Sequence, residues 1–316
     1  MPVAERTLWR RIGVTIPAGA DNAAMIESAG LGWNVSKRRI CMETDVGSTP
    51  IDGYYAIRRD DTLAPLGVVR KVYEPIQNAD AFKFFEPAVR AGELAYETAG
   101  TLGGGKRVWI QALVSGAPVL ADIDPVKAYL LLCNSHDGTM KLTVGFTPER
   151  IICGNMLNSA LGGLADPIRI KHTGTAEVRL AGLQEVVRTV LSMYQKMDGT
   201  FRRMVDRKMT AEERVGFFDT VAPGKGKQAQ DRRDRFGMII ASEPTIQPQF
   251  RETLWGAFNA VTFYVDHELV EQRRIKDPLT SLWFGSGATV RNRAISAAMR
   301  LIAPLPTGET LTAVTV

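Results

Sequence analysis

The chain has 316 residues, 45% of them hydrophobic, and it carries a formal net charge of +5 with a sequence pI of about 9.1. This composition excludes a disordered protein, and no apolar run approaches the roughly 20 residues that a membrane-spanning helix needs. The first residues, MPVAERTLWRRIGV, lack the apolar centre of a signal peptide. We therefore predict a soluble, cytoplasmic protein with no membrane partner and a bias towards anionic partners.

Three cysteines, Cys41, Cys133 and Cys153, are odd in number and far apart in the sequence. They form neither a disulfide framework nor a CxxC zinc knuckle, and reduced core cysteines are the expectation. The length allows one large domain or two ordinary ones.

The first third of the chain predicts a short helix, three strands and a second helix. Asp21 suits the N-cap of the first helix, and a turn at Asp60–Asp61 joins the second and third strands. Asn78 or Asp80 caps the second helix, in which Pro87 predicts a kink. In chain order, these elements are a helix over Asp21–Gly30, strands over Trp33–Thr44, Tyr55–Arg58 and Gly67–Tyr73, and a helix through FKFFEPAVRAGE (82–93).

The segment Tyr96–Val114, YETAGTLGGGKRVWIQALV, has two β-rich runs on either side of three glycines. Residues Gly100–Lys106 match a phosphate-binding loop, G-x-x-x-x-G-K, but Arg107 stands where that loop needs Ser or Thr. The VWI run that follows favours a strand over a phosphate-binding helix. We therefore reject an ATPase site, predict no cofactor, and expect a hairpin with a cationic tip. On these residues alone, a surface hairpin with solubilising charges is the simpler interpretation.

Beyond the hairpin, the pattern changes from strands to helices. A polar turn at Asn134–Gly138 separates two strands, and Pro148 suits the first turn of a helix. Thr210–Glu213 is a capping box, whereas PGKGKQAQDRRDR (223–235) predicts a loop or mobile linker. The other elements are strands over Ala128–Cys133, Met140–Phe146 and Ile168–His172, and helices over Arg150–Leu161, Thr175–Arg207 (with Gly199 as a point of interruption), Gln249–Leu269 and Thr289–Ile302.

This order predicts an α+β fold: an antiparallel sheet with an inserted helix and a glycine-rich hairpin, followed by a mostly helical C-terminal half. We expect an α+β core domain over residues 1–208 and a helical C-terminal region over 209–316. The second region either stands apart or packs on the core as part of one domain.

Lysines and arginines recur in pairs, and several pairs have an aromatic neighbour. Such pairs commonly mark solvated turns and helix faces, and most of the rings are expected in the core. The more specific hypothesis is a groove in which cations follow a phosphate backbone while rings stack on bases. Tyr54 and Tyr73 are further stacking candidates. The predicted nucleic-acid contacts are Arg58, Arg59, Arg70, Lys71, Lys106, Arg107, Trp109, Arg169, Lys171 and His172.

Local sequence predicts neither a metal site nor a catalytic residue, because the three histidines are scattered and no nucleophile motif is present. Asp122 and Asp124 would share a face if extended, as some two-metal sites require. A metal-dependent nuclease or phosphoryl-transfer enzyme that uses these carboxylates with His136 and Asp137 is therefore an alternative. A turn role for His136 and a helix cap at Asp124 are the simpler interpretations.

Seven segments, in order along nearly the whole chain, resemble a known family. They are LGVVRKVYEPIQNADAF (66–82), YETAGTLGGGKRVWIQA (96–112), YLLLCNSHDG (129–138), ERIICGNMLNSAL (149–161), IKHTGTAEVRL (170–180), WGAFNAVTFYVDH (255–267) and SLWFGSGA (281–288). On these segments the chain is identified as a member of the domain of unknown function 932 family. The resemblance implies an origin on bacterial phages, prophages or plasmids, and no assigned activity.

The order of strands, glycine hairpin and helices is also remotely similar to phage single-strand annealing proteins of the Erf, Sak and RecT kind. Our leading hypothesis is a protein that holds single-stranded DNA in a basic groove and promotes annealing in recombination or replication, as a homo-oligomer and without a cofactor. Whether it also has an enzymatic activity stays open, and its absence is the favoured expectation. A phage protein that binds a host factor, with the basic pairs as plain surface, is a third possibility.

Overall fold

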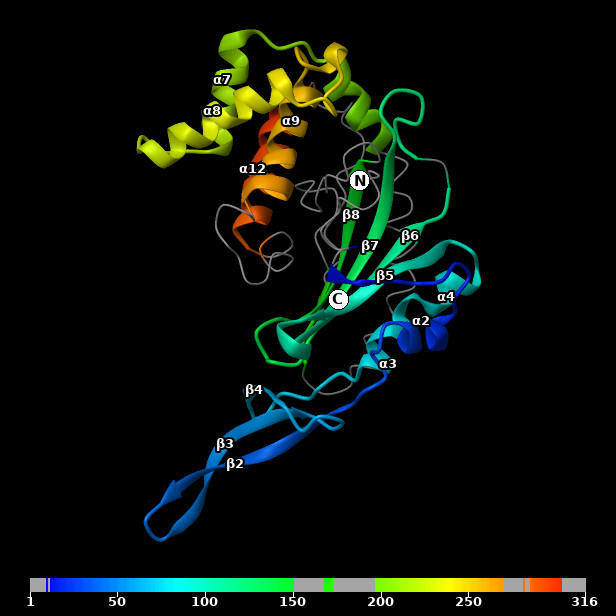
Figure 1. Ribbon diagram of the computed structural model, residues 1–316, viewed down its shortest axis with the longest axis vertical. Coiled ribbons are helices and arrows are strands. Elements are labelled where there is room, and N and C mark those ends of the chain that lie inside the picture. The colour runs from blue at the N-terminus through cyan, green and yellow to red at the C-terminus, as the bar shows by residue number, and fades with distance from the viewer. Residues whose placement is uncertain are drawn as a thin grey trace.

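The computed structural model describes residue 10, residues 12–116, 118–150, 168–172 and 197–269, residue 281 and residues 285–302. The fold is α+β, as predicted: strands occupy mostly the N-terminal half and helices mostly the C-terminal half. Two separate antiparallel sheets lie along the long axis of the molecule, and a group of helices lies at the end far from the smaller sheet (Figure 1).

The large sheet has six antiparallel strands in the order β1-β5-β6-β7-β8-β9. Its central strands are almost entirely buried, because β-branched and leucine side chains alternate with other apolar residues over both faces. The hairpin predicted around three glycines is confirmed as β5 and β6. The strands are β1 (Val14–Thr15), β5 (Leu94–Leu102), β6 (Arg107–Val114), β7 (Val126–Ser135), β8 (Leu142–Arg150) and β9 (Ile168–Ile170).

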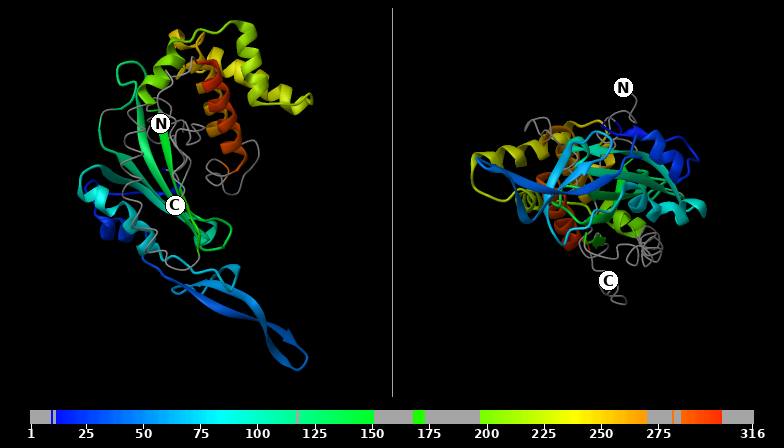
Figure 2. Two further views of the ribbon diagram at one scale, coloured as in Figure 1. Left: turned by 180° about the vertical axis from the view of Figure 1, so that it is seen from behind. Right: turned by 90° about the horizontal axis from the view of Figure 1, so that it is seen from below.

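The small sheet contains β2 (Val35–Thr44), β3 (Gly47–Arg59) and β4 (Pro65–Arg70), in that order. The long β2–β3 hairpin extends away from the rest of the molecule, as both side views show (Figures 1 and 2). The sequence predicted these strands but not that they form a sheet of their own.

Three short helical segments replace the single helix expected over residues 82–93. They are α3 (Asn78–Phe82), a 3-10 turn (Lys83–Phe85) and α4 (Glu86–Arg90). Pro87 occupies the first turn of α4, where its missing N–H is not needed, so it begins a helix and does not kink one. The first predicted helix is confirmed as α2 (Asn22–Ser28), capped by the Asp21 side chain.

The C-terminal half is helical in the described residues. Its elements are residues 197–206, α7 (Ala211–Val221), α8 (Lys227–Ser242), a 3-10 turn (Pro248–Phe250), α9 (Leu254–Phe263), a π-helical segment (Tyr264–Leu269) and α12 (Ser286–Leu301). The capping box at Thr210 and Glu213 is confirmed. Helix α9 is buried from Leu254 to Thr262, so it forms the centre of this group.

The linker predicted over residues 223–235 is wrong, because α8 covers most of it. Long-range ion pairs hold this polar segment as a helix: Arg235 pairs with Glu268 through two hydrogen bonds of 2.7 Å, and Arg233 pairs with Asp219 at 3.0 Å. The C-terminal part of α8 is apolar and includes the buried Phe236. The polar segment predicted as a linker is therefore the solvated part of an amphipathic helix.

A second correction concerns Pro148, which lies in β8 opposite Ala128 and does not open a helix. The third predicted strand ends at Arg70, earlier than expected. Most of the helices predicted over 150–161 and 175–207 lies outside the described residues, although residues 197–206 are helical through Gly199. The division into domains at residue 208 stays a prediction.

Candidate nucleic-acid interface

The small sheet stands on the turns of two hairpins of the large sheet. A Cβ atom on Gly67 would lie 2.7 Å from the Asp137 Cα, so β4 touches the β7–β8 turn backbone to backbone. A Cβ atom on Gly105, in the β5–β6 turn, would lie 3.3 Å from the side chains of Arg59 and Trp33. We call this contact region the junction. It brings the glycine hairpin and the strands β2–β4 together.

One face of the small sheet points away from the junction. The strand register sets Arg38 opposite Ala56 and Tyr54 opposite Arg70, and residues opposite one another point to the same face. Alternation along each strand adds Arg58 and Val68 to this face. The alternate residues Ile57 and Val69 are buried towards the junction. The outer face therefore carries Arg38, Tyr54, Arg58, Val68 and Arg70.

The outer face combines three guanidinium groups with one open aromatic ring. Arg38 and Arg70 are exposed, Arg58 is half-buried, and the Tyr54 side chain is 44% exposed. Arg38 Nε donates to Ser36 Oγ at 3.2 Å, and Ser36 Oγ donates to Asp60 at 2.6 Å, so one carboxylate lies beside this face. Guanidinium groups bind phosphates and a ring in water stacks on a base, so this face has the chemistry of a single-strand binding surface.

Three exposed lysines surround the junction: Lys71, Lys106 and Lys171. Lys71 follows Arg70 directly, where the chain leaves β4, and its carbonyl accepts a 2.6 Å hydrogen bond from Lys37. Lys171 lies nearby, because the rings of Tyr73 and His172 stack with centroids 4.8 Å apart. The Lys106 carbonyl accepts a 2.7 Å hydrogen bond from the backbone N–H of His136. Three separate chain segments thus place lysines around the junction.

Other predicted cations have partners within the chain. Arg59 donates to Asp61 over 2.9 and 2.6 Å and lies over the Trp33 ring at 4.2 Å, so its charge is largely compensated. Arg107 donates to Thr139 at 3.0 Å. Arg169 is exposed, but it lies opposite Thr143 on the edge strand β9 and is not part of the outer face. These residues are poorer candidates for phosphate contact than the outer face.

The prediction that Trp109 stacks on bases is wrong, because the side chain is completely buried. Its ring occupies space left by two glycines: Cβ atoms on Gly13 and Gly100 would lie 2.5 and 3.2 Å from it. Tyr73 is also buried, and its hydroxyl donates to the Ser135 carbonyl at 2.7 Å. Tyr54 is therefore the stacking candidate that the structure leaves open to solvent.

The predicted phosphate contact of His172 is also wrong. The side chain is buried, and burial lowers its pKa to about 4, so the ring is neutral near pH 7. Its backbone carbonyl accepts a 2.8 Å hydrogen bond from the N–H of Glu74. His172 therefore connects β9 to the small sheet.

Beneath the junction lies a buried polar cluster around His136. Its Nε2 is 2.8 Å from Oδ1 of Asn78, whose Nδ2 donates to the Leu31 and Trp33 carbonyls at 3.0 and 3.2 Å. Burial lowers the pKa of His136 to about 4, and the nearby His172 and Arg59 lower it further, whereas Asp137 opposes the shift. This cluster fixes the geometry of the junction with neutral groups.

The residues of the alternative nuclease site are not brought together. Asp122 and Asp124 precede β7, whereas His136 and Asp137 follow it, and nine steps of about 3.3 Å separate its ends by roughly 30 Å. Asp122 pairs with Arg202 at 2.7 Å, and Asp124 accepts a 2.8 Å hydrogen bond from the Trp255 indole. Within the described residues, no group of three or more His, Cys, Asp or Glu side chains is arranged to hold a metal ion.

Sequence reasoning missed two sets of cations. The first is Arg38, which strand alternation separates from its neighbours Lys37 and Arg39: Lys37 turns inwards and donates to the Lys71 and Tyr73 carbonyls at 2.6 and 2.7 Å. The second set, on α12, contains Arg293 and Arg300. Their spacing of seven residues on a predicted helix was the signal for a shared face.

In the described part of the chain, no helix combines the length and the apolar character needed to cross a bilayer.

Comparison with known proteins identifies the family of the chain. No curated protein and no solved structure matches the chain. A family model described as domain of unknown function (DUF932) matches residues 65–294, well over half of the sequence. The match includes β4 and the strands β5 to β9 of the large sheet but begins after β1, β2 and β3. The chain therefore belongs to the DUF932 family.

Proposed function

We propose that this protein binds single-stranded DNA along the outer face of the small sheet and the lysines around the junction. One observation carries the proposal: Arg38, Arg58 and Arg70 share a face with the exposed ring of Tyr54. Guanidinium groups follow a phosphate backbone, while a ring stacks on unpaired bases whatever their sequence.

The shape of this surface favours a single strand over a duplex. A base in a duplex is already stacked and paired, so an isolated exposed ring contributes only where bases are free. The proposed role is annealing of complementary strands in recombination or replication, by a homo-oligomer encoded on a phage or plasmid. The similarity in element order to Erf, Sak and RecT proteins supports this role only as analogy.

The direct test measures fluorescence anisotropy of a labelled 30-nucleotide strand across a salt series. Each phosphate contact on single-stranded DNA contributes a slope of about −0.7 to log K against log salt. The double variant Arg38→Gln/Arg70→Gln should therefore bind more weakly and lower the size of the slope by about 1.4. An unchanged slope and affinity would remove the proposal.

A matched control keeps the same change of charge elsewhere. Lys225 and Lys227 are exposed at the start of α8, in the helical half of the molecule. The variant Lys225→Gln/Lys227→Gln should bind as the unmodified chain does. Equal losses in both variants would indicate a general effect of net charge and would contradict a specific site.

Annealing is tested separately, with two complementary strands that carry a fluorescence donor and acceptor. The protein should accelerate the rise of energy transfer, and Arg38→Gln/Arg70→Gln should abolish the acceleration. Strand binding without any acceleration would restrict the function to binding.

A further inference from the structure

The distal half of the β2–β3 hairpin is exposed to solvent along almost its whole length. We call residues 41–53 the arm tip; all are exposed except the half-buried Thr44. Three large apolar side chains there are open to solvent, Met42, Ile51 and Val46, the last of which is 96% exposed. An isolated two-stranded hairpin is only marginally stable in water. A long hairpin with bare apolar side chains therefore calls for a second surface that covers it.

The charge of the arm tip indicates what kind of surface this is. The tip carries Glu43, Asp45 and Asp52 and neither Lys nor Arg, so its formal charge is −3. Because the whole chain carries +5, the rest of the chain carries +8, since 5 minus −3 is 8. A tip of this charge is repelled by a phosphate backbone. It is complementary to the remainder of another copy of the same chain.

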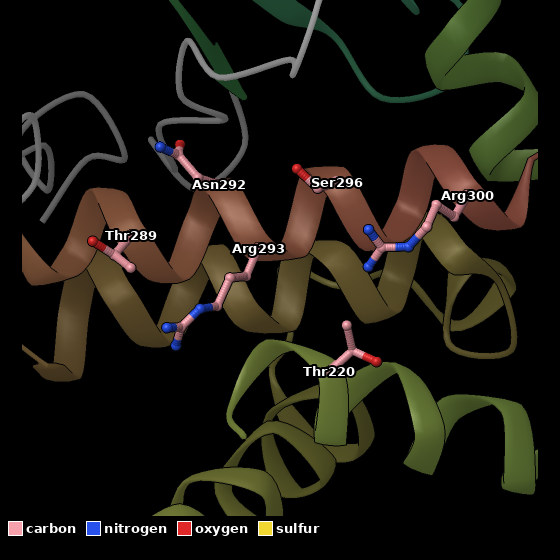
Figure 3. A pocket seen from close by; sticks show the side chains of 6 residues that line it. All are labelled: Thr220, Thr289, Asn292, Arg293, Ser296 and Arg300. Atoms are coloured by element: carbon pink, nitrogen blue, oxygen red, sulfur yellow. The ribbon is translucent and has the colours of Figure 1, made fainter. Parts of the chain in front are cut away.

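A basic cleft at the other end of the molecule is complementary in charge to the carboxylates of the arm tip. The cleft, of about 430 Å³, lies between α7 and α12 (Figure 3). Arg293 and Arg300 are exposed, and both lie along the α12 side of the cleft. Among the described residues, no ion pair with either arginine occurs. The remaining lining side chains are neutral hydrogen-bonding groups: Thr220, Thr289, Asn292 and Ser296.

The arm tip and the cleft cannot meet within one chain. The arm points away from one end of the molecule, and α7 and α12 lie at the other end (Figures 1 and 2). From this arrangement we infer that the arm tip of one copy docks in the α7–α12 cleft of the next copy, with its carboxylates paired to Arg293 and Arg300. The two contacting surfaces differ, so the contact is head-to-tail and generates a ring or a filament.

This inference deepens the homo-oligomer of the proposed function, but it does not depend on DNA binding. Its test therefore measures mass by multi-angle light scattering after removal of nucleic acid with nuclease and high salt, followed by return to low salt. The unmodified chain should run as an oligomer whose mass falls as salt rises, because the contact is ionic and partly exposed. A monomer at every concentration and salt level would overturn the inference, while leaving strand binding to be judged by anisotropy.

Charge reversal identifies the two surfaces. Glu43→Lys/Asp45→Lys/Asp52→Lys should reduce the oligomer to a monomer, and so should Arg293→Glu/Arg300→Glu. A mixture of the two variants should recover the oligomer, because the reversed arm tip fits the reversed cleft and the unmodified arm tip of one variant still fits the unmodified cleft of the other. The control Lys225→Glu/Lys227→Glu changes charge by the same amount outside the cleft and should keep the mass of the unmodified chain. Failure of the mixture to associate, or loss of the oligomer in the control, would overturn the assignment of the cleft.

The exposed thiol of Cys41 at the base of the arm tip allows an independent test of the docking by crosslinking. A photoreactive maleimide on this cysteine should crosslink to peptides of α7 or α12 of another copy, identified by mass spectrometry. Crosslinks confined to other surfaces would contradict the proposed docking.

Discussion

The backbone of Asp137 lies directly against Gly67, so close that a Cβ atom on Gly67 would stand 2.7 Å from the Asp137 Cα. This contact sets the small sheet on the β7–β8 turn and thereby fixes the direction of the outer face. A position so near to backbone atoms admits no side chain without movement of one sheet relative to the other.

We expect Gly67→Ala to displace the small sheet and lower the free energy of unfolding by about 1–3 kcal/mol. Strand affinity should fall with it, because Arg70 and Lys71 follow on the same segment. Gly216→Ala is the control: Gly216 lies in α7 with nothing within 4 Å of its added Cβ, so the change should stabilise by roughly 0.5–1 kcal/mol. Urea unfolding and anisotropy measure both effects, and an unaltered Gly67→Ala protein would contradict the described contact.

Tyr54 and Trp109 should separate binding from stability. Tyr54→Ala removes an exposed ring, so affinity for single strands should fall by about 1–3 kcal/mol while the unfolding midpoint stays within error. Trp109→Ala empties a buried site and should cost roughly 3–5 kcal/mol of unfolding free energy. At a temperature where the Trp109 variant is still folded, its affinity should match that of the unmodified chain. The reverse pattern would restore the original stacking hypothesis.

The two buried histidines predict acid sensitivity. Burial lowers the pKa of His136 and of His172 to about 4, whereas both titrate near 6.5 in the unfolded chain. The unfolded state therefore takes up protons first as pH falls, and stability is lost between about pH 6.5 and 4, at up to roughly 1.4 kcal/mol per pH unit for each histidine. The substitution His172→Phe keeps an aromatic ring against Tyr73 and removes one of the two groups that take up a proton on unfolding. Its unfolding free energy, measured by urea titration, should change less steeply over this range.

Glu149 predicts the opposite trend at higher pH. Burial raises its pKa to about 8, and Glu97 adds to the shift, while Arg10 and Lys127 oppose it. The unfolded carboxyl releases its proton above about pH 4.5, so this contribution to stability is lost as pH rises from there to about 8. Between pH 6.5 and 8 the histidines contribute equally to both proteins, so the unmodified chain should lose stability relative to Glu149→Gln. Parallel curves for the two proteins would show that the carboxyl is ionised when folded.

The Trp255–Asp124 hydrogen bond connects α9 to the segment that leads into the large sheet. Because both side chains are buried, Trp255→Phe should lower the unfolding free energy by about 1.5–3 kcal/mol, the range for hydrogen bonds to charged groups. A double-mutant cycle with Asp124→Asn measures the interaction. A coupling energy near zero would mean that this bond does not hold the helical half on the sheet.

Local signals in the sequence predicted the local structure well. The capping box at Thr210 and Glu213, the N-cap at Asp21 and the turn of three glycines each depend on a few neighbouring residues, and each is confirmed. Such local patterns carry no information about which residues far apart in the sequence come into contact. Helix α8 was missed because its polar residues are held by Asp219 and Glu268, which are distant or unmarked in sequence.

For the candidate site, too, the sequence predicted the local features and not the long-range ones. That cations would meet aromatic rings on β3 and β4 was readable from the sequence, and Arg58 and Arg70 do share a face with Tyr54. The burial of Trp109 was not readable, since it depends on Gly13 from a different strand region lying across the ring. That β2–β4 form a sheet of their own could not be predicted either, because the alternation of apolar and polar residues along a strand is the same whichever sheet the strand joins.

Strands β2 and β4 are the two open borders of the small sheet, and each presents backbone donors and acceptors without a neighbouring strand. Arginines on both borders discourage other chains from adding there, since like charges would meet edge to edge. The same residues that we assign to DNA thus also protect the protein from stacking into β-aggregates. Neutralising these arginines is therefore expected to lower the solubility of the chain as well as its affinity for single strands.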